Sequence, residues 1–403
     1  MTFGGFSPTR KALAPVQRTG AFLLPAGHAD DFPSGEWYPD SRAIGVHSFV
    51  RFGVAADTVQ IDGSYGEGGG QIIRTALSLA AITGRAVEVF NVRAGRAKPG
   101  LQRQHLTAVH AAAALCDAEV AGAAVGSMYF RFAPRRPPAP QPYRFEIGTA
   151  GATPLVLQTA LLPLSRAGHP SRVSVVGGTH VPHAPPVEYL EAVYLPALAQ
   201  AGLRAKFGYD KAGFYPRGGG EVTLDVEPSE LGPLDLIERG KLTSLTAYIV
   251  TAELPDHVGE RGARAVQRFM KGVGRPVNVI PRNLPSLGPG AAVVLAAQCE
   301  GGWAGFTGIG APGKPMERVA EEPCEAFMEW WASGAACDEH LADQLVLPMS
   351  LALSDSSWST PVITEHLRTV LWLTAQFVPI ECGLEERHGG PALIRLKVRP
   401  EVR

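Results

Sequence analysis

The sequence has few cysteines and no arrangement of residues that is typical of a metal centre. Its five cysteines are scattered and form no CxxC pair, and its eleven histidines show no HExxH or similar spacing. Scattered thiols of this kind are typical of proteins in a reducing compartment. These absences exclude a thiolate metal site and favour a cytoplasmic location.

The chain also has almost no net charge, and it has no long apolar run. Its 403 residues carry a formal charge of −1, so the surface as a whole does not attract nucleic acid or anionic lipid, and a polyanion must be met by a local basic patch. No apolar run reaches the ~18 residues that suggest a membrane span. The composition, 45% hydrophobic and 19% charged, is that of a globular chain long enough for two or three domains.

The first 56 residues lack the hydrophobic periodicity of the remainder. They are rich in glycine, proline and serine, and their one apolar piece, AFLLPAG, lacks the length and the basic leader of a signal peptide. We interpret residues 1–56 as a flexible N-terminal extension or as translation assigned too far upstream, and the sequence leaves both interpretations open.

One layout then occurs three times: a small-residue turn, an apolar helix, a β segment and a second helix. The first helices of the three passes are expected within residues 71–84, 148–164 and 340–353, and the second helices within 101–116, 187–203 and 364–378. Each first helix carries a glutamine, and the first and third passes share a histidine, in QHLTAV and EHLRTV, at the second helix. We interpret these passes as repeats of one αβ unit.

The stretch between the second and third passes reads as a different αβ unit. Strand patterns such as SLTAYIVTA and AAVVLAAQC alternate there with two helical patterns. We therefore predict an α/β fold class built of α+β modules, with a large domain of three repeated αβ units at 57–238 and 333–403. A smaller αβ domain at 239–332 is expected to be inserted between the second and third units, since insertions are tolerated at exposed loops.

The stretch GSYGEGGGQIIR is unusual because it places an acid within a glycine-rich loop. Such a loop at a helix start can cradle phosphate on its backbone N–H groups, but Glu67 would repel phosphate unless a divalent cation lay between them. The loop lacks the GK[ST] of a Walker motif. Either it admits a metal-chelated triphosphate with Glu67 as a metal ligand, or it is a tight turn with a solvated Glu67.

The densest basic patch follows the first predicted β segment, in RAGRAKPGLQRQH. Arginines in such a loop can bind phosphate oxygens through the paired N–H donors of their planar guanidinium groups. The alternative interpretation is an exposed basic loop that binds no ligand. His366 lies at the start of a predicted amphipathic helix. A histidine at this position has either a structural role or a catalytic role. His105 occupies the matching place in the first pass.

Taken together, these motifs resemble the RNA 3′-terminal phosphate cyclase family. The stretches that carry the resemblance are IDGSYGEGGGQIIR, VRAGRAKPGLQRQHL, FEIGTAGATPLVLQTALLPL, GGTHVPHAPP, GFYPRGGGEV, HLADQLVLPM and TEHLRT. They extend from about residue 60 to the C-terminus. The resemblance implies the same fold of three αβ modules with a small inserted domain.

The resemblance also implies a reaction and a set of site residues. ATP would adenylate a histidine, AMP would pass to an RNA 3′-phosphate, and the neighbouring 2′-hydroxyl would close a 2′,3′-cyclic phosphate. It assigns catalytic roles to His366 as nucleophile and to Arg74, Arg93, Arg96, Gln104 and His105. It assigns ATP binding to Gln158, Pro185, His340, Leu341, Ala342, Asp343 and Gln344, and Mg²⁺ or Mn²⁺ to Glu67. The implied partners are ATP and RNA with a 3′-phosphate end, with no membrane.

Two positions depart from the family pattern, and two other classes stay open. His340 stands where family members often have an aromatic tyrosine, and Val370 where they often have asparagine. Non-catalytic relatives in ribosome assembly and RNA processing lack the nucleophilic histidine, so His366 disfavours that alternative. The enolpyruvyl transferases share only the modular architecture, and the pairing of HLADQ with TEHLRT disfavours them.

Overall fold

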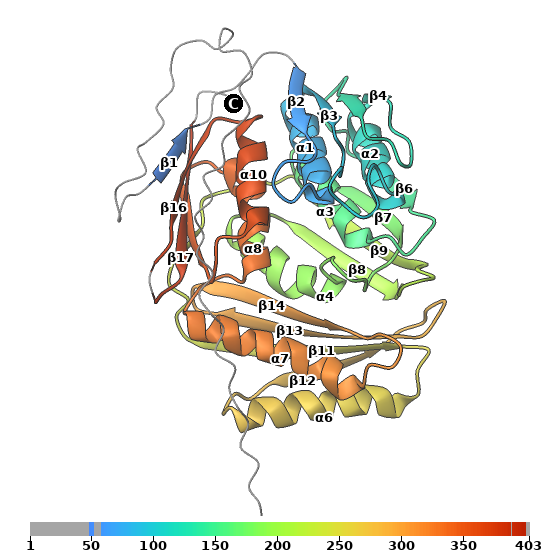
Figure 1. The fold of residues 1–403 in the computed structure, drawn as a ribbon, viewed down its shortest axis with the longest axis vertical. Coiled ribbons are helices and arrows are strands. Elements are labelled where there is room, and N and C mark those ends of the chain that lie inside the picture. The colour runs from blue at the N-terminus through green and yellow to red at the C-terminus, as the bar shows by residue number, and fades with distance from the viewer. Residues whose placement is uncertain (1–47, 52–57, 388, 400–403) are drawn as a thin grey trace, which may run out of the picture. The chain divides into compact units, whose positions relative to one another are not determined.

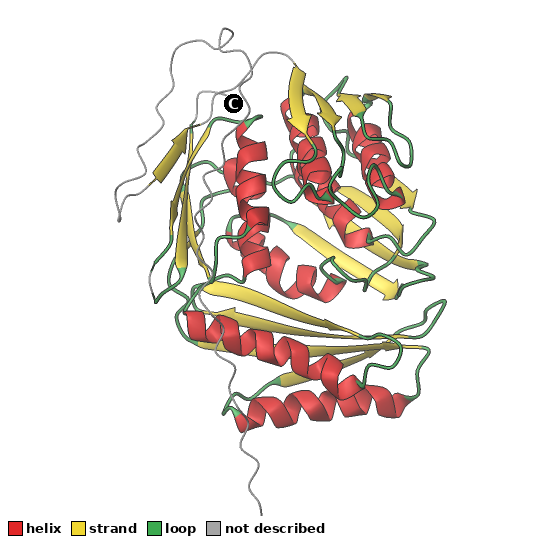
Figure 2. Cartoon of the chain, viewed as in Figure 1, coloured by secondary structure: helices red, strands yellow, loops and turns green. Residues whose placement is uncertain are grey.

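The computed structural model describes residues 48–51, 58–387 and 389–399, which belong to one compact unit. They form a mixed α/β structure with several mixed sheets (Figure 2). The predicted N-terminal extension lies outside the described residues, apart from strand β1 (Ser48–Arg51), which pairs with β16 (Ile380–Glu385). The sequence analysis predicted no strand there.

The first two passes each fold as a four-stranded sheet with two helical segments. The first contains β2 (Thr58–Asp62), α1 (Gly70–Thr83), β3 (Ala86–Phe90), α2 (Arg103–Cys116), β4 (Glu119–Ala121) and β5 (Phe130–Ala133). The second contains β6 (Pro142–Glu146), α3 (Thr153–Ser165), β7 (Ser171–Gly177), the helical run α4 (Val187–Tyr189), η1 (Leu190–Tyr194) and α5 (Leu195–Gln200), and β8 (Ala205–Lys211) and β9 (Gly220–Val226). The predicted helices are confirmed in both passes.

The third pass draws its elements from two distant parts of the chain. It contains β10 (Asp235–Leu236), α8 (Glu339–Gln344), α9 (Val346–Ser350), β15 (Ser356–Thr360), α10 (Glu365–Ala375), β16 and β17 (Ala392–Val398). The β segment of the third pass is β15, to which the sequence analysis gave no residue range, because SSWST by itself has little strand pattern. Strand β15 gains its structure from pairing with β17 and β10.

The three sheets share one strand order. In each, the first strand of the pass runs parallel to the second, the second pairs antiparallel with the last, and the last pairs antiparallel with the third. The orders are β2-β3-β5-β4, β6-β7-β9-β8 and β10-β15-β17-β16, with β1 added to the third. The repeat predicted from the sequence is therefore a repeat of topology.

A fourth sheet is formed by the chain between β10 and α8. Its strands are β11 (Leu242–Ala252), β12 (Asn278–Asn283), β13 (Gly290–Cys299) and β14 (Gly302–Ile309), and its helices are α6 (Asp256–Gly272) and α7 (Met316–Ser333). Val293 and Leu295 of β13 pack with α6 and α7, while Val294 and Ala296 join the core of the repeated units. Because side chains alternate along a strand, β13 is buried on both faces, with α7 on one side of its sheet and α4 (Val187–Tyr189) on the other (Figure 1).

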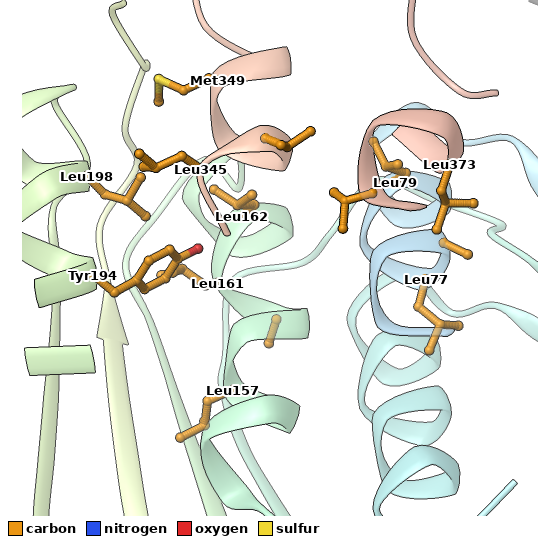
Figure 3. Packing of buried hydrophobic residues seen from close by; sticks show 14 of the residues in the cluster. Leu77, Leu79, Leu157, Leu161, Leu162, Tyr194, Leu198, Leu345, Met349 and Leu373 are labelled. Atoms are coloured by element: carbon orange, nitrogen blue, oxygen red, sulfur yellow. The ribbon is translucent and has the colours of Figure 1, made fainter. Parts of the chain in front are cut away.

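One apolar core connects the three repeated units. Helices α1 and α10 lie side by side, and Figure 3 shows Leu77 and Leu79 of α1 close to Leu373 of α10. Leu161 of α3 and Leu345 belong to the same buried cluster. Burial of such side chains is worth about 1.5–3 kcal/mol each, so this shared core fixes the starts of helices from all three units relative to one another.

Candidate active site

A single cavity of about 1370 Å³ receives side chains from all three repeated units and from β14 and α7. The predicted site residues that line it are Glu67, Arg74, Arg93, Arg96, Gln104, His105, Gln158, Pro185, His340, Asp343, Gln344 and His366. Leu341 and Ala342 do not line it, because both lie on the side of α8 that is buried in the core. The structure therefore brings together residues that lie up to about 300 positions apart in the chain.

The glycine-rich loop at the start of α1 packs tightly against its neighbours. A Cβ on Gly70 would overlap the imidazole of His105 and lie 3.0 Å from Nη1 of Arg74, and one on Gly69 would lie 3.0 Å from Nη2 of Arg96. Gly66, at φ +55°, leaves no room for a Cβ beside Oγ1 of Thr369. Side chains of the protein thus fill the space that these glycines leave, so the glycines permit close packing of the loop against basic residues and α10.

Glu67 of this loop contacts His366 across the boundary between two units. Its Oε2 lies 2.6 Å from Nε2 of His366 and 3.1 Å from Nη2 of Arg96. The other ring nitrogen of His366, Nδ1, lies 3.9 Å from Oδ2 of Asp343. His366 is the second residue of α10, which begins after Thr364, whose side chain accepts a hydrogen bond from the Leu367 N–H. The imidazole therefore lies between the carboxyl groups of Glu67 and Asp343 at the start of a helix; burial raises the pKa of Asp343 well above its ordinary value.

His105 is the buried counterpart of His366 in the first unit. Its Nδ1 accepts a hydrogen bond of 3.1 Å from the Gln102 N–H, so the proton of the neutral ring is on Nε2. Burial, reinforced by the charges of Arg74 and Arg93, lowers the pKa of His105 to about 3. At neutral pH His105 is therefore an uncharged imidazole that offers an N–H donor and cannot serve as a cation.

Four arginines line the cavity: Arg74, Arg93, Arg96 and Arg103. The first three differ in their surroundings. Burial lowers the pKa of Arg74 to about 10, although Asp343 opposes the change, so Arg74 stays charged at neutral pH. Arg93, at φ +53°, donates through Nη1 to the carbonyls of Lys98 and Gly100 and so also holds its own loop. Arg96 is paired with Glu67.

Polar side chains from the first helix of each unit meet in the cavity. Gln158 of α3 donates a hydrogen bond of 2.8 Å to Oε1 of Gln344 of α8, and Gln71 of α1 lines the same cavity. Gln104 accepts a hydrogen bond from the Ala152 N–H, which connects α2 to the second unit. The glutamine that repeats in the sequence is therefore a feature of the site in all three units.

The sequence analysis missed several lining residues. Asp338 accepts hydrogen bonds from the backbone of α8 and of Gly305 and from the Tyr189 hydroxyl. Phe306 and Trp330 come from β14 and α7. Asp338 could have been found as the residue that precedes a helix start, but no local pattern marks the two aromatic residues, because only the tertiary fold brings them to the cavity.

The residues present do not form a metal site by themselves. Among the described residues, no group of three or more His, Cys, Asp or Glu side chains is arranged so that it could hold a metal ion, and Glu67 already faces His366 and Arg96. Magnesium often binds through one or two carboxylates together with substrate phosphates and water. Glu67 fits a cation only in that shared form.

Comparison with known proteins identifies the family. A model of the family "RNA 3′-terminal phosphate cyclase" matches residues 65–384. The chain belongs to this family. A cyclase of Methylococcus capsulatus is 46% identical over 351 residues, which are 83% of this chain and 97% of the relative. Cyclases of Gloeothece citriformis and Ralstonia nicotianae are each 43% identical, over 82% and 85% of this chain and 97% and 98% of their own lengths.

Both departures from the cyclase pattern lie at the cavity. His340 lines it with a side chain that is 69% exposed, so the ring is accessible to a base. Val370 lines it on α10, one turn after His366. His340 therefore changes the surface that is exposed in the cavity, whereas Val370 both lines the cavity and belongs to the buried core of the repeated units.

Proposed function

We propose that this chain converts an RNA 3′-terminal phosphate to a 2′,3′-cyclic phosphate in an ATP-dependent reaction that releases AMP and diphosphate. The observation that carries the proposal is the position of His366 in one cavity with Glu67, Arg74, Arg96 and the Gln158–Gln344 pair. Membership of the cyclase family supports the same reaction.

In the first step His366 is the nucleophile. An unprotonated imidazole nitrogen forms a bond to the α-phosphorus of ATP while the bond to the diphosphate oxygen breaks. A free imidazole has a pKa of about 6.5, so much of it is neutral near pH 7. Arg74 and Arg96 stabilise the charge that develops on the phosphoryl oxygens. The covalent histidine–AMP intermediate divides one difficult condensation into easier steps.

In the later steps the 3′-phosphate of RNA displaces His366 from the AMP phosphorus and forms an anhydride. The neighbouring 2′-hydroxyl then attacks the activated 3′-phosphorus, and AMP leaves with the electrons of the broken P–O bond. The two reacting groups are already adjacent on one ribose, so the closure benefits from proximity. His105 and Gln104 contribute N–H donors to phosphate without adding a charge.

The metal, the domain arrangement and the location belong to the same proposal. Glu67 would hold Mg²⁺ or Mn²⁺ together with phosphate oxygens, and the cation would neutralise phosphate charge.

The separate apolar cluster of α6, α7 and one face of their sheet supports a small domain at 239–332, inserted between units at 57–238 and 333–403. The five cysteines are free and buried, which supports the cytoplasm. None of the helices in the described part of the chain has the length and apolarity that crossing a bilayer demands.

The test follows AMP from α-labelled ATP. The parent protein should retain the label in a bond that is labile to acid and stable to alkali, as a phosphoramidate is, and His366→Ala should lose both the label and cyclisation. His366→Ala should still cyclise a pre-made RNA 3′-phosphate–AMP anhydride, since the covalent step is bypassed. His110→Ala, an exposed histidine on α2 outside the cavity lining, is the control and should keep the label.

The same measurement separates the alternatives. Labelling of His366→Ala at the parent level would contradict the proposed mechanism, and failure of the folded variant on the anhydride would give His366 a second role. A parent protein that takes no label and yet binds RNA would favour a non-catalytic role in RNA processing. Transfer from phosphoenolpyruvate without labelling would favour the enolpyruvyl transferases.

A further inference from the structure

A buried polar cluster joins the two ends of the loop that connects β7 to α4. The proposed reaction steps do not involve this cluster. The loop spans residues 178–186; His180 lies near its start, and Glu188 is the second residue of α4, directly after its end. Nε2 of His180 and Oε2 of Glu188 lie 2.8 Å apart, and both side chains are completely buried. We call this pair the clasp.

Two further strands contribute hydrogen bonds to the clasp. The hydroxyl of Tyr209 on β8 donates to Oε1 of Glu188, and Nη1 of Arg282 on β12 donates to the same oxygen at 3.2 Å. Burial by itself would raise the pKa of Glu188, but His180, Tyr209 and Arg282 more than offset burial and bring the pKa to about 2. The carboxylate is therefore ionised and only accepts, so Nε2 of His180 donates.

Arg282 also connects the clasp to the fourth sheet. It pairs with Glu191 at 3.0 Å, and its guanidinium lies 4.8 Å from the ring centre of Tyr248 on β11. Helix α4 packs on strands β13 and β14 of that sheet (Figure 1). A buried ionic network of this kind gives little net stability, but it holds the two ends of the loop in one arrangement.

The loop presents a strained residue to the cavity. His183 lies at φ +62°, a conformation that is uncommon for residues other than glycine and that persists where the surroundings enforce it. Val181, His183, Ala184 and Pro185 all line the cavity, and Val181 and Ala184 pack with Leu155 of α3. Leu155 lies one helical turn before Gln158 on α3.

We propose that Glu188 is a positioning residue that, through the clasp, holds His183 as a contact to the nucleoside of ATP. The inference rests on the proposed function and adds a residue to it. An apolar wall of valine, alanine and proline suits the face of a base, and His183 adds a polar group beside it. In the other two units the matching helix starts present His105 and His366 to the cavity. In this unit Glu188 stands at the helix start and is buried, and the loop before it presents His183 to the cavity.

The experiment measures binding of an ATP analogue in which a methylene group replaces the α,β-bridging oxygen, so that AMP cannot transfer. His183→Ala and Glu188→Gln should each raise the Kd of the analogue about tenfold, and the double variant should be no more than about twofold weaker than either, because the two residues act as a unit. Tyr209→Phe, which removes only one hydroxyl, should give a smaller rise in the same direction. Glu317→Gln, which alters a two-pronged pair with Arg261 outside the cavity lining, is the matched control and should leave the Kd unchanged.

Three outcomes would overturn the inference and leave the proposed function standing. Variants that melt at a lower temperature but bind the analogue as the parent does would make the clasp purely structural. A rise in the KM for RNA with an unchanged Kd for the analogue would assign the loop to RNA. If the effects of His183→Ala and Glu188→Gln multiply in the double variant, the two residues act separately. A parent protein that does not bind the analogue would overturn the proposed function as well, so the two failures are distinguishable.

Discussion

Acid should destabilise this protein through His105, and the size of the effect follows from its burial. The pKa of His105 falls from an ordinary 6.5 to about 3 because the ring is buried beside Arg74 and Arg93. Between these two values the unfolded chain binds a proton that the folded chain does not, so the free energy of unfolding decreases as the pH falls. At about 1.36 kcal/mol for each pH unit, the full contribution is about 5 kcal/mol, present above pH 6.5 and lost by about pH 3.

The perturbation that isolates this contribution is His105→Asn. The side-chain carbonyl of asparagine can accept the hydrogen bond from the Gln102 N–H in place of Nδ1, and asparagine does not titrate. Urea unfolding of parent and variant between pH 7 and pH 4.5 should show that the parent loses about 2–3 kcal/mol more than the variant over this range. His110→Asn on the same helix controls for the removal of a histidine.

Parallel curves for the parent and His105→Asn would refute the reasoning, because they would mean that His105 binds its proton equally in both states. The same conclusion would follow if His110→Asn flattened the dependence as much as His105→Asn does. Absolute stabilities can differ between the variants without affecting the test, since only the change with pH carries the prediction.

Three further predictions concern the cavity. Gly70→Ala should lower kcat/KM for cyclisation at least about tenfold, because its methyl group would overlap the ring of His105. Gly95→Ala is the control and should leave kcat/KM unchanged, since its Cβ would meet nothing within 4 Å. Equal losses in the two variants would contradict the packing argument. Glu67→Gln should raise the Mg²⁺ or Mn²⁺ concentration for half-maximal AMP labelling about tenfold, and an unchanged metal dependence would remove Glu67 from the metal site. His340→Tyr should preserve or tighten ATP binding, since a phenol ring offers more stacking area than imidazole; tenfold weaker binding would indicate a specific hydrogen bond from His340.

Local patterns in the sequence were sufficient for the helices and for part of the cavity lining. Helix α1 ends directly before Gly84, at φ +70°, as its glycine predicts, and α10 begins after Thr364. The glycine loop, the basic patch and the HLADQ and TEHLRT stretches contain many of the charged and polar residues that line the cavity. Such features are readable because helix boundaries and short motifs depend on neighbours within a few residues.

The tertiary structure alone decided what depends on distant parts of the chain. Strand β15 exists through its pairing with β10 and β17, and the aromatic residues of β14 and α7 reach the cavity only because their sheet packs against the repeated units. The low pKa of His105 and the clasp around Glu188 follow from burial among charged groups that lie far apart in the sequence. Burial and electrostatic interaction are properties of proximity in space, which residue order alone does not determine.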